Sequence, residues 1–517
     1  MKKSICLLLL SFYVVHFAIA QAPDDIIKYS YFPQHGTARS IAIGGAMGSL
    51  GGDLSAAYVN PAGLGLYRTS EVVISPGFQF NKNNADFRGF NASSAKSAFD
   101  LGLSGVVFGS QNRYSRNRSE AFAVAINQTA NFNNTLTYSG QNDFSSYSEQ
   151  FAEEISKNGY SPDDLLNTNS VAPFGSALAY QTHLIEIPYD SATGQYSVFG
   201  TPEVILGNGG ILKQTKTIRT TGGIYEVALS YAANTNDRFY YGITLGIPIV
   251  SYTRNSYIRE EDASNNSNND FSYSEWNDKL KTNGYGVNVK LGLMFKPTDD
   301  VRLGLAIHSP TYYKLTDEES ANMTTAFTNG EVFTDNSATF TNGGIGSTGY
   351  LTYTPWKFIA SGSYVFREAS DVHQQRGFIT ADAEYVTYPS SSYRSDGEMV
   401  ADGEDDYYAA LKSVIKDYYK GAFNFRVGGE LKFNTLAVRL GGAFYGNPYN
   451  DDALKSNITQ ISGGLGYRNK GIFIDLTYAY IINKDVNFPY RLQDKDNTFA
   501  TYKNNRGNAM LTVGFKL

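Results

Sequence analysis

Residues 423–433 read FNFRVGGELKF, with an apolar residue at almost every second position. Successive side chains of a β-strand point to opposite faces, so one face of this segment is apolar and the other carries Asn, Arg, Glu and Lys. A polar second face kept over about ten residues matches a tilted membrane-spanning strand that lines a polar barrel interior. The segment therefore predicts one strand of a transmembrane β-barrel.

The same alternation recurs along the chain and predicts fourteen strands. A soluble β-sandwich also alternates, so the connections between the strands must distinguish the two folds. The predicted strands cover residues 71–80, 97–109, 119–137, 211–232, 238–258, 283–296, 301–315, 349–366, 376–389, 421–433, 435–446, 456–468, 471–482 and 505–517.

The connections alternate between short and long. Every even-numbered connection is short, as in residues 233–237, 297–300 and 469–470, and most odd-numbered ones are long, as in 81–96 and 138–210. Transmembrane barrels sort their connections in this way, with periplasmic turns on one rim and surface loops on the other. Nothing in a soluble β-sandwich requires its connections to be sorted into short and long ones in this way. The predicted fold class is therefore all-β, a 14-stranded antiparallel transmembrane β-barrel.

The composition excludes several classes of protein. The 517 residues carry 43 basic and 49 acidic side chains, a net charge of −6, which argues against the basic face of a nucleic-acid-binding protein. The single cysteine, Cys6, excludes a disulfide scaffold, a cysteine-ligated zinc site and a cysteine nucleophile. After residue 20, no apolar run approaches the ~18 residues of a spanning helix, which excludes a helical inner-membrane protein.

Residues 1–20 have the features of a secretory signal peptide. Two lysines precede an apolar stretch, residues 5–19, which closes with Ala18-Ile19-Ala20. We expect cleavage before Gln21. A membrane anchor is the alternative, but the apolar run is short for one and polar residues follow it. The expected mature chain has 497 residues (517 − 20) and no cysteine.

Residues 21–70 do not alternate and are rich in small residues. Glycines at positions 45, 48 and 51 invite a phosphate-loop interpretation, but no strand precedes them and no Gly-Lys-Ser/Thr follows. Close backbone packing is the better account, because glycine lets chain segments approach without side chains. This segment is predicted to contain short helices at most, one of them around residues 54–58.

This segment resembles a known family. Gly44-Gly45-Ala46 and the motif Asn60-Pro61-Ala62-Gly63 are similar to the N-terminal hatch of the FadL/TodX family of outer-membrane transporters for hydrophobic compounds. Residues 241–248 and 302–310 resemble the branch often labelled "hemin receptor". After the signal peptide at 1–20, the resemblance implies a hatch (plug) of short helices at 21–70 and a fourteen-stranded barrel with long surface loops at 71–517.

The resemblance also implies a function. It predicts passive uptake of a hydrophobic or amphipathic small molecule, such as a long-chain fatty acid, through the outer membrane of a Gram-negative bacterium. The expected protein is a monomer that contacts outer-membrane lipid and a hydrophobic ligand, and it binds no nucleic acid. The alternative is a barrel that serves as an accessory factor and binds a protein partner in secretion or surface assembly.

Two groups of side chains are candidates for ligand contacts. Apolar residues at helical spacing in two surface loops form either a ligand-catching groove or packing on the protein itself. They are Tyr407, Tyr408, Leu411, Val414, Ile415 and Tyr418 in one loop, and Phe151 and Ile155 in the other. Charged residues on the polar strand faces form ion pairs, or one basic member binds a carboxylate head group. They are Lys290, Arg302, Asp382, Glu384, Arg426, Glu430 and Arg439.

A lateral exit for the ligand would need a break in strand pairing. Proline and glycine remove or weaken ladder hydrogen bonds, so Pro76-Gly77, Pro248 and Pro355 are candidate positions. Each is also compatible with a simple bulge at the rim.

The sequence predicts no enzyme, no cofactor and no metal site. The histidines after residue 20 are spread over different predicted elements, and no His-Glu-x-x-His or Gly-x-Ser-x-Gly motif occurs. They are His35, His183, His308 and His373. A haem would need ligands that these scattered residues do not provide as a pair. The Asn/Asp-rich run at 261–270 lacks the spacing of a calcium loop.

Overall fold

A computed structural model describes residues 23–111, 118–167, 172–192, 194–264, 266, 269–341, 343–366, 376–397, 404–451, 454 and 456–517. The predicted signal peptide, with Cys6 and the cleavage point before Gln21, lies outside the described residues, as does His373. None of the described helices has the length and hydropathy needed to cross a bilayer.

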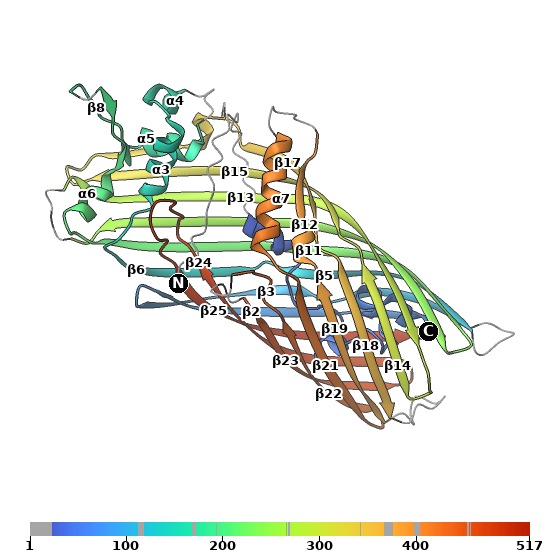
Figure 1. The fold of residues 1–517 in the computed structure, drawn as a ribbon. Coiled ribbons are helices and arrows are strands. Elements are labelled where there is room, and N and C mark those ends of the chain that lie inside the picture. The colour runs from blue at the N-terminus through green and yellow to red at the C-terminus, as the bar shows by residue number, and fades with distance from the viewer. Residues whose placement is uncertain are drawn as a thin grey trace, which may run out of the picture.

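The described strands form a closed antiparallel barrel of fourteen strands, as the sequence predicts (Figure 1). Closure is made by the last strand, which pairs with the first from Glu71↔Lys516 to Phe87↔Ala500. In chain order the strands are β1 (Glu71–Ile74) with β2 (Pro76–Phe87), β3 (Phe90–Leu101) with β4 (Ser104–Gln111), β5 (Ser119–Asn131) with β6 (Asn134–Asn142), β11 (Leu212–Thr235), β12 (Phe239–Asp262), β13 (Phe271–Phe295), β14 (Val301–His308) with β15 (Tyr312–Phe327), β17 (Gly346–Tyr353) with β18 (Lys357–Phe366), β19 (Gly377–Val386) with β20 (Ser392–Ser395), β21 (Ala422–Phe433), β22 (Leu436–Tyr445), β23 (Ile458–Asn469), β24 (Ile472–Asn487) and β25 (Ala500–Lys516).

Burial along the strands is inverted relative to a soluble protein. On β21, Phe423, Phe425 and Val427 are exposed on the outer face, whereas Asn424 and Arg426 are buried in the interior. The same contrast runs around the barrel, so the outer face is a continuous apolar belt. A closed barrel with such a belt is the architecture of outer-membrane proteins, because it leaves no backbone group unpaired in lipid. The protein is therefore located in the outer membrane of a Gram-negative bacterium.

The strands extend well beyond the bilayer on the long-loop side. β11, β12 and β13 contain 24, 24 and 25 residues. At roughly 3.3 Å per residue they are about 80 Å long, compared with a hydrocarbon core of roughly 30 Å. Figure 1 shows this wall projecting toward the surface helices. The predicted strands are too short at these ends because the apolar alternation stops where the membrane stops.

One predicted connection is wrong. Residues 81–96 were expected to form a long surface loop, but they belong to the hairpin of β2 and β3, which turns at Arg88 and Gly89. Both turn residues have positive φ angles, 52° and 85°. The outer face of this hairpin carries Lys82 and Asn84 rather than apolar residues because it stands above the belt. Its sequence therefore looks like a loop.

The N-terminal residues form a hatch inside the barrel, in the positions coloured blue in Figure 1. Its glycines and alanines are buried, and short helices alternate with turns that have positive φ at Gly44, Gly45 and Gly51. The helices are η1 (Pro23–Tyr29), α1 (Ala38–Ala42), α2 (Ala56–Val59) and η2 (Pro61–Leu66). Asn60 caps η2, because its side chain accepts a hydrogen bond from the Ala62 N–H.

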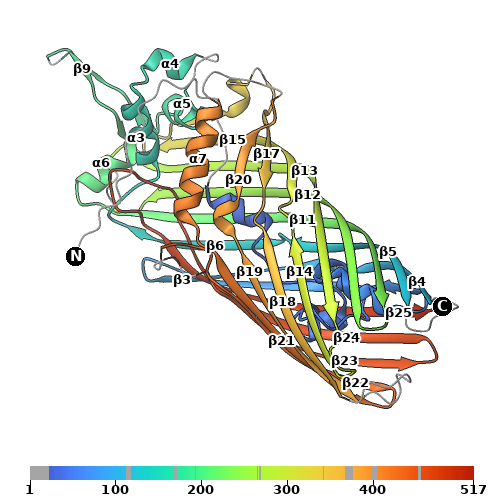
Figure 2. The ribbon, with the colours of Figure 1, turned by 45° about the vertical axis from the view of Figure 1, so that its right-hand side comes forward.

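Surface connections carry the remaining elements, most of them at the long-loop end (Figure 2). The helices are α3 (Ser148–Asn158), α4 (Pro162–Leu166), α5 (Phe174–Gln181), α6 (Thr201–Gly207) and α7 (Glu404–Tyr418), with η3 (Ser337–Thr339) and η4 (Tyr388–Ser390). Small strands are β7 (Ile185–Glu186), β8 (Tyr189–Asp190), β9 (Gln195–Tyr196), β10 (Phe199–Gly200) and β16 (Val332–Asn336). α3 ends at Gly159, whose left-handed conformation (φ 67°) is typical of a helix C-cap.

Candidate ligand-binding site in the barrel lumen

Residues 28–35, which we call the strap, run from the end of η1 across the lumen toward α1. His35 anchors one end: its Nε2 lies 2.9 Å from an Asp100 oxygen and its Nδ1 lies 3.1 Å from the Asn127 side-chain oxygen. The Gln34 N–H donates to the Tyr445 hydroxyl at 2.7 Å, and Lys357 Nζ lies 3.4 Å from the Ser30 carbonyl oxygen. The strap is thus attached to opposite sides of the wall and separates two cavities.

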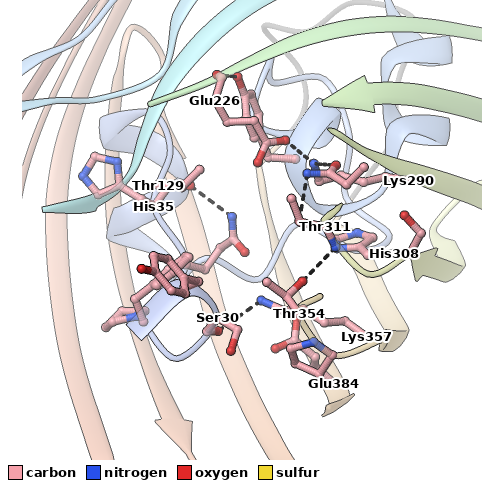
Figure 3. Close-up of a pocket in the computed structure, with 18 of the residues that line it drawn as sticks. Ser30, His35, Thr129, Glu226, Lys290, His308, Thr311, Thr354, Lys357 and Glu384 are labelled. Carbon is pink, nitrogen blue, oxygen red and sulfur yellow. Dashed lines mark hydrogen bonds and ion pairs between the residues drawn. The ribbon is translucent and has the colours of Figure 1, made fainter. Parts of the chain in front are cut away.

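The first cavity, which we call the paired cavity, is lined by three lysine or arginine side chains that each have a partner: two form ion pairs, and Lys357 contacts the Ser30 carbonyl (Figure 3). Its volume is about 90 Å³. Lys290 forms an ion pair with Glu226 and donates to the Asn288 oxygen at 2.8 Å. Arg426 Nη2 lies 3.1 Å from a Glu384 oxygen. Because each of these charges has a partner, the cavity stabilises the position of the strap and offers little to an incoming ligand.

The second cavity, which we call the seam cavity, lies on the other side of the strap. Its volume is about 240 Å³, and Phe32, Phe132 and Ile481 supply apolar walls. Arg506 of β25 also lines it, and within the described part of the chain its guanidinium has no hydrogen bond or ion pair. The acidic neighbour Asp100 is already bonded to His35, Asn131 and Asn508. An apolar cavity with one uncommitted cation suits an amphipathic anion.

The wall beside the seam cavity lacks a backbone ladder. Among the described strands, β3 pairs only with β2 and β6 pairs only with β11, whereas the β4–β5 ladder ends at Ser104 and Ile126. Side chains bridge the interval instead: Ser94 Oγ and Asn83 Nδ2 both donate to the Thr135 carbonyl, at 2.7 and 2.6 Å. We call this junction between β3 and β6 the seam. A junction held by side chains has fewer hydrogen bonds to break than a continuous ladder.

The three proline positions singled out in the sequence also mark irregular pairing. Pro76 begins β2 after the interruption at Ser75, and Pro355 lies between β17 and β18. Pro248 stays paired with Glu226 of β11, but the ladder between β12 and β13 skips it. The seam itself contains no proline. It begins at residues 102–103 and 132–133, where both strands are interrupted, and continues between β3 and β6.

The hatch closes the lumen below the cavities. Asn60 Nδ2 donates to the carbonyls of Gly48 at 2.6 Å and of Leu293 in β13 at 3.1 Å. Strand glycines make room for this contact, because a Cβ atom on Gly292 would lie 2.0 Å from Asn60 Oδ1 and one on Gly242 would lie 2.5 Å from the Pro61 backbone. The Asn60-Pro61-Ala62-Gly63 motif is therefore a docking element between hatch and wall.

The lumen charges singled out in the sequence all point inward and are buried. Arg439 forms ion pairs with Glu430 and with Asp475, and Arg39 of the hatch lies 3.4 Å from Glu430. Arg302 Nη1 donates to the carbonyl of Leu50 in the hatch. These contacts tie the hatch to the wall. Asp382 belongs to the same group, because it accepts from the Gly48 N–H.

The apolar loop residues pack on the protein itself. On α7, Tyr408, Leu411 and Ile415 are buried against η1 and the wall, while Val414 is exposed and Tyr407 and Tyr418 are half-buried at the margin. Phe151 and Ile155 of α3 belong to a second buried cluster with α5 and the inner face of β12 and β13. These residues position the surface helices above the lumen.

Sequence reasoning missed the strap and Arg506. The strap has no periodicity and no motif, so nothing in residues 28–35 distinguishes it from the rest of the hatch. Arg506 could have been found, because it shares the inner face of the terminal strand with Met510 and Thr512. Arg506 lies within the predicted terminal strand, residues 505–517, so its inner-face position follows from the alternation.

These features define an outer-membrane barrel whose lumen is closed by an N-terminal hatch. No protein-family model and no curated protein matches the sequence. Among solved structures, a FadL homologue of Pseudomonas aeruginosa is similar over 94% of this chain and 98% of its own, with 13% identity and a TM-score of 0.52. The toluene transporter TodX of P. putida is similar over 94% and 99%, with 12% identity and a TM-score of 0.51. At these identities the likeness concerns the fold, and the predicted resemblance to FadL and TodX is confirmed at that level.

Proposed function

We propose that the protein is a passive outer-membrane channel for hydrophobic or amphipathic small molecules. The observation that carries this proposal is the seam cavity, with its apolar walls, its uncommitted Arg506 and its position beside the seam. An alkyl chain would pack against Phe32, Phe132 and Ile481, and a head-group carboxylate would pair with Arg506. A fatty-acid-like monocarboxylate is the ligand that combines these two parts.

The arrangement of the hatch supports lateral rather than axial release. Axial release would require Arg39–Glu430 and the backbone contacts of Asn60 to break together. Lateral release requires only that β3 and β6 separate at the seam, where side chains replace the ladder. In this proposal the ligand enters from the surface helices, displaces the strap, occupies the seam cavity and leaves sideways between β3 and β6.

The similar structures support the class of substrate. The protein from P. putida is described as a toluene transporter, so this barrel-and-hatch fold carries small hydrophobic compounds in that case. Toluene has no charge, and an uncommitted arginine would give it no advantage. The charged head group is therefore the part of the proposal that rests on this chain alone.

Lipid extraction followed by mass spectrometry tests the proposal. The wild-type protein should be purified in native membrane discs and its bound small molecules compared with those of Arg506→Met and Arg506→Lys variants. We expect monocarboxylates to co-purify with the wild type, to be depleted about tenfold or more in Arg506→Met, and to be partly retained in Arg506→Lys. Equal amounts in all three proteins would contradict the assignment of Arg506, and no bound hydrophobic compound in any of them would contradict the proposed function.

A further inference from the structure

A polar groove lies on the outer face of the barrel wall, above the apolar belt. Its volume is about 790 Å³. The neighbouring strands β11, β12, β13 and β15 form its floor in the long wall of Figure 1, and the connection between β16 and β17 forms one edge. It shares no described lining residue with the two cavities beside the strap. We call it the outer-wall groove.

Strand alternation places this groove on the side of the sheet that faces away from the lumen. Ile249 of β12 and Tyr285 of β13 are cross-strand partners in the belt, 49% and 62% exposed. The pairing continues without a change of register to Asn255 and Lys279, which line the groove, and Tyr257 follows on the same face of β12. Because alternate residues of a strand share a face, these groove residues point outward like the belt.

The height of the groove above the belt limits which lipids can reach it. Ile249 is the last aliphatic residue on the outer face of β12, and Ser251, Thr253 and Asn255 follow it. The six steps from Ile249 to Asn255 cover about 20 Å along the strand at roughly 3.3 Å per residue, or about 15 Å of height for the roughly 40° tilt of barrel strands. The head-group layer of a bilayer is roughly 5–8 Å thick on each side. Only a lipid with an extended head group therefore reaches the groove from the belt.

Two cations of the groove lack partners. Arg219 of β11 and Lys279 of β13 are exposed, and over the part of the chain that the structure describes their side chains make no hydrogen bond and no ion pair. Both are cross-strand partners of Asn255, so their Cα atoms are about 10 Å apart at roughly 4.8 Å per strand. Among the described lining residues the only carboxylate is Asp278, which belongs to the inner face and lies 3.2 Å from Arg254. The groove thus presents two positive charges and no free negative one.

The neighbouring charges on the same face are paired. Toward the outer end of the strands, Lys213 lies 3.1 Å from Glu261. Toward the membrane, Lys281 lies 2.9 Å from Glu318. A single exposed cation needs no partner and would indicate nothing, but here two of them flank one groove between rows of paired charges. Two positive charges about 10 Å apart suit a ligand with two separated anionic groups.

The side chains around the two cations suit a sugar. Asn255 and Asn277 are exposed in the groove, and their amide groups can both donate hydrogen bonds to hydroxyl groups and accept them. The Tyr257 hydroxyl donates to a Glu275 oxygen at 2.8 Å, which holds the Tyr257 ring at the edge of the groove. An aromatic ring beside polar groups can cover the less polar face of a sugar ring. An exposed polar floor of this kind offers little to an alkyl chain.

We propose that the outer-wall groove binds the anionic core saccharide of a lipopolysaccharide in the outer leaflet, with Arg219 and Lys279 pairing with its phosphate or carboxylate groups. Lipopolysaccharide has the extended head group that the height of the groove requires, and its core sugars carry both kinds of anion. Its acyl chains lie on the belt below, while Asn255 and Asn277 contact the sugars. The inference concerns the membrane around the barrel and does not depend on which molecule passes through the lumen.

Native mass spectrometry tests this site directly. The purified protein in detergent micelles is titrated with three probes: a rough-type lipopolysaccharide with a phosphorylated core, lipid A without core sugars, and the free core oligosaccharide released from the same lipopolysaccharide. We expect the intact lipopolysaccharide to bind at least tenfold more tightly than either of the other two, because it alone contacts the groove and the belt together.

Variants at the two cations separate a specific site from a general effect of charge. The double variant Arg219→Gln, Lys279→Gln should weaken binding of the lipopolysaccharide at least tenfold and leave lipid A unaffected, and Arg219→Lys, Lys279→Arg should retain most of the affinity. The matched control is Lys213→Gln, Lys281→Gln, which removes the same charge from the same face at two paired lysines. This control should change the affinity less than twofold. Heat-modifiable gel mobility would verify that each variant retains the folded barrel.

Four results would overturn the inference. The first is that the wild type binds no lipopolysaccharide. The second is an equal loss of affinity in the two glutamine double variants, which would reduce the effect to net charge. Lipid A that binds as tightly as the intact lipopolysaccharide would place the contact at the belt rather than in the groove. Free oligosaccharide that binds as tightly as the intact lipid would make a soluble saccharide the occupant.

Discussion

The two cavities beside the strap share Phe32, Pro33, Gln34 and His35 but differ in how their charges are used. In the paired cavity, Lys290 and Arg426 have carboxylate partners, whereas Arg506 in the seam cavity has none among the described residues. The wall differs as well, since an irregular seam borders only the second cavity. The difference shows that buried charge alone does not mark a ligand site. A ligand site is marked instead by a charge without a partner that lies beside strands which can separate.

Locking the seam should have the largest effect. The only cysteine of the sequence is Cys6, so a Ser94→Cys, Thr137→Cys pair can be introduced across the seam without competing thiols; Ser94 Oγ lies 3.2 Å from the Thr137 nitrogen. We expect oxidation to reduce uptake of a labelled fatty acid by tenfold or more, because β3 and β6 can no longer separate. Reductant should restore uptake in the same sample.

The matched control is a Val106→Cys, Val124→Cys pair, which bridges the continuous ladder between β4 and β5. Oxidation of this pair should leave uptake unchanged. Uptake that persists through a locked seam would show that the ligand leaves by another route.

Breaking a pair in the paired cavity should affect stability rather than binding. Lys290→Met leaves the buried Glu226 carboxylate without its cationic partner. We expect a loss of about 3–5 kcal/mol in the free energy of unfolding, measured by urea-induced unfolding in lipid vesicles. Fatty-acid binding by the protein that remains folded should not change. A selective loss of binding with normal stability would assign the ligand to the paired cavity instead.

Arg506→Met should show the opposite pattern. Removing an uncommitted guanidinium leaves no buried carboxylate unpaired, so stability should change little. Carboxylate affinity should fall by about 1.5–3 kcal/mol, the range for a charge-assisted hydrogen bond, which calorimetry can measure. The neutral alcohol of equal chain length serves as the control ligand and should bind both proteins equally. Loss of alcohol binding as well would indicate a packing defect rather than a lost charge.

The smallest effect is expected outside both cavities, at Glu203 of α6. Burial raises the pKa of Glu203 to about 7, and the nearby charge of Glu149 adds to this increase. The hydrogen bond that the Glu203 carboxylate accepts from the Gly200 N–H at 2.8 Å acts in the opposite direction and lowers the pKa. Because the folded-state pKa lies above the ordinary value near 4.5, the folded surface helices bind the proton more tightly than the unfolded chain does. The contribution of Glu203 to their stability is therefore fully present below about pH 4.5 and is lost as the pH rises through 7.

Hydrogen exchange of residues 143–211 at pH 5.5 and pH 8 would measure this effect. Protection should be modestly greater at the lower pH, and Glu203→Gln should remove most of the difference. Affinity in the seam cavity should not follow this profile, because Glu203 lies in the surface helices. An unchanged pH profile in Glu203→Gln would show that other groups control the stability of these helices.

The sequence predicts the parts of the fold that the membrane dictates. The alternation in β21 and β22 follows from lipid on one side and a polar lumen on the other, so each residue's face can be assigned from the sequence. The β2–β3 hairpin escapes this rule because it stands above the bilayer, where Lys82 and Asn84 replace apolar residues on the outer face. The sequence therefore locates the strands, but it does not show how far they extend above the bilayer.

The candidate site was less predictable for a physical reason. Arg426, Arg439 and Arg506 all occupy inner-face positions and look equivalent in sequence, and only their partners in three dimensions distinguish them. The seam likewise depends on how β6 meets the inner face of the β2–β3 hairpin, which no local proline or glycine pattern encodes. Sequence alternation places a side chain in the lumen, but it does not show whether that side chain is already paired.

The most direct test of the central claim is the position of a bound ligand. Crystals of the protein grown with 11-bromoundecanoate can be measured at the bromine absorption edge, which locates the end of the chain independently of the rest of the density. We predict a carboxylate within hydrogen-bond distance of Arg506 and a bromine peak among the apolar walls of the seam cavity. A bromine peak in the paired cavity, or a ligand that makes no contact with Arg506, would contradict the account.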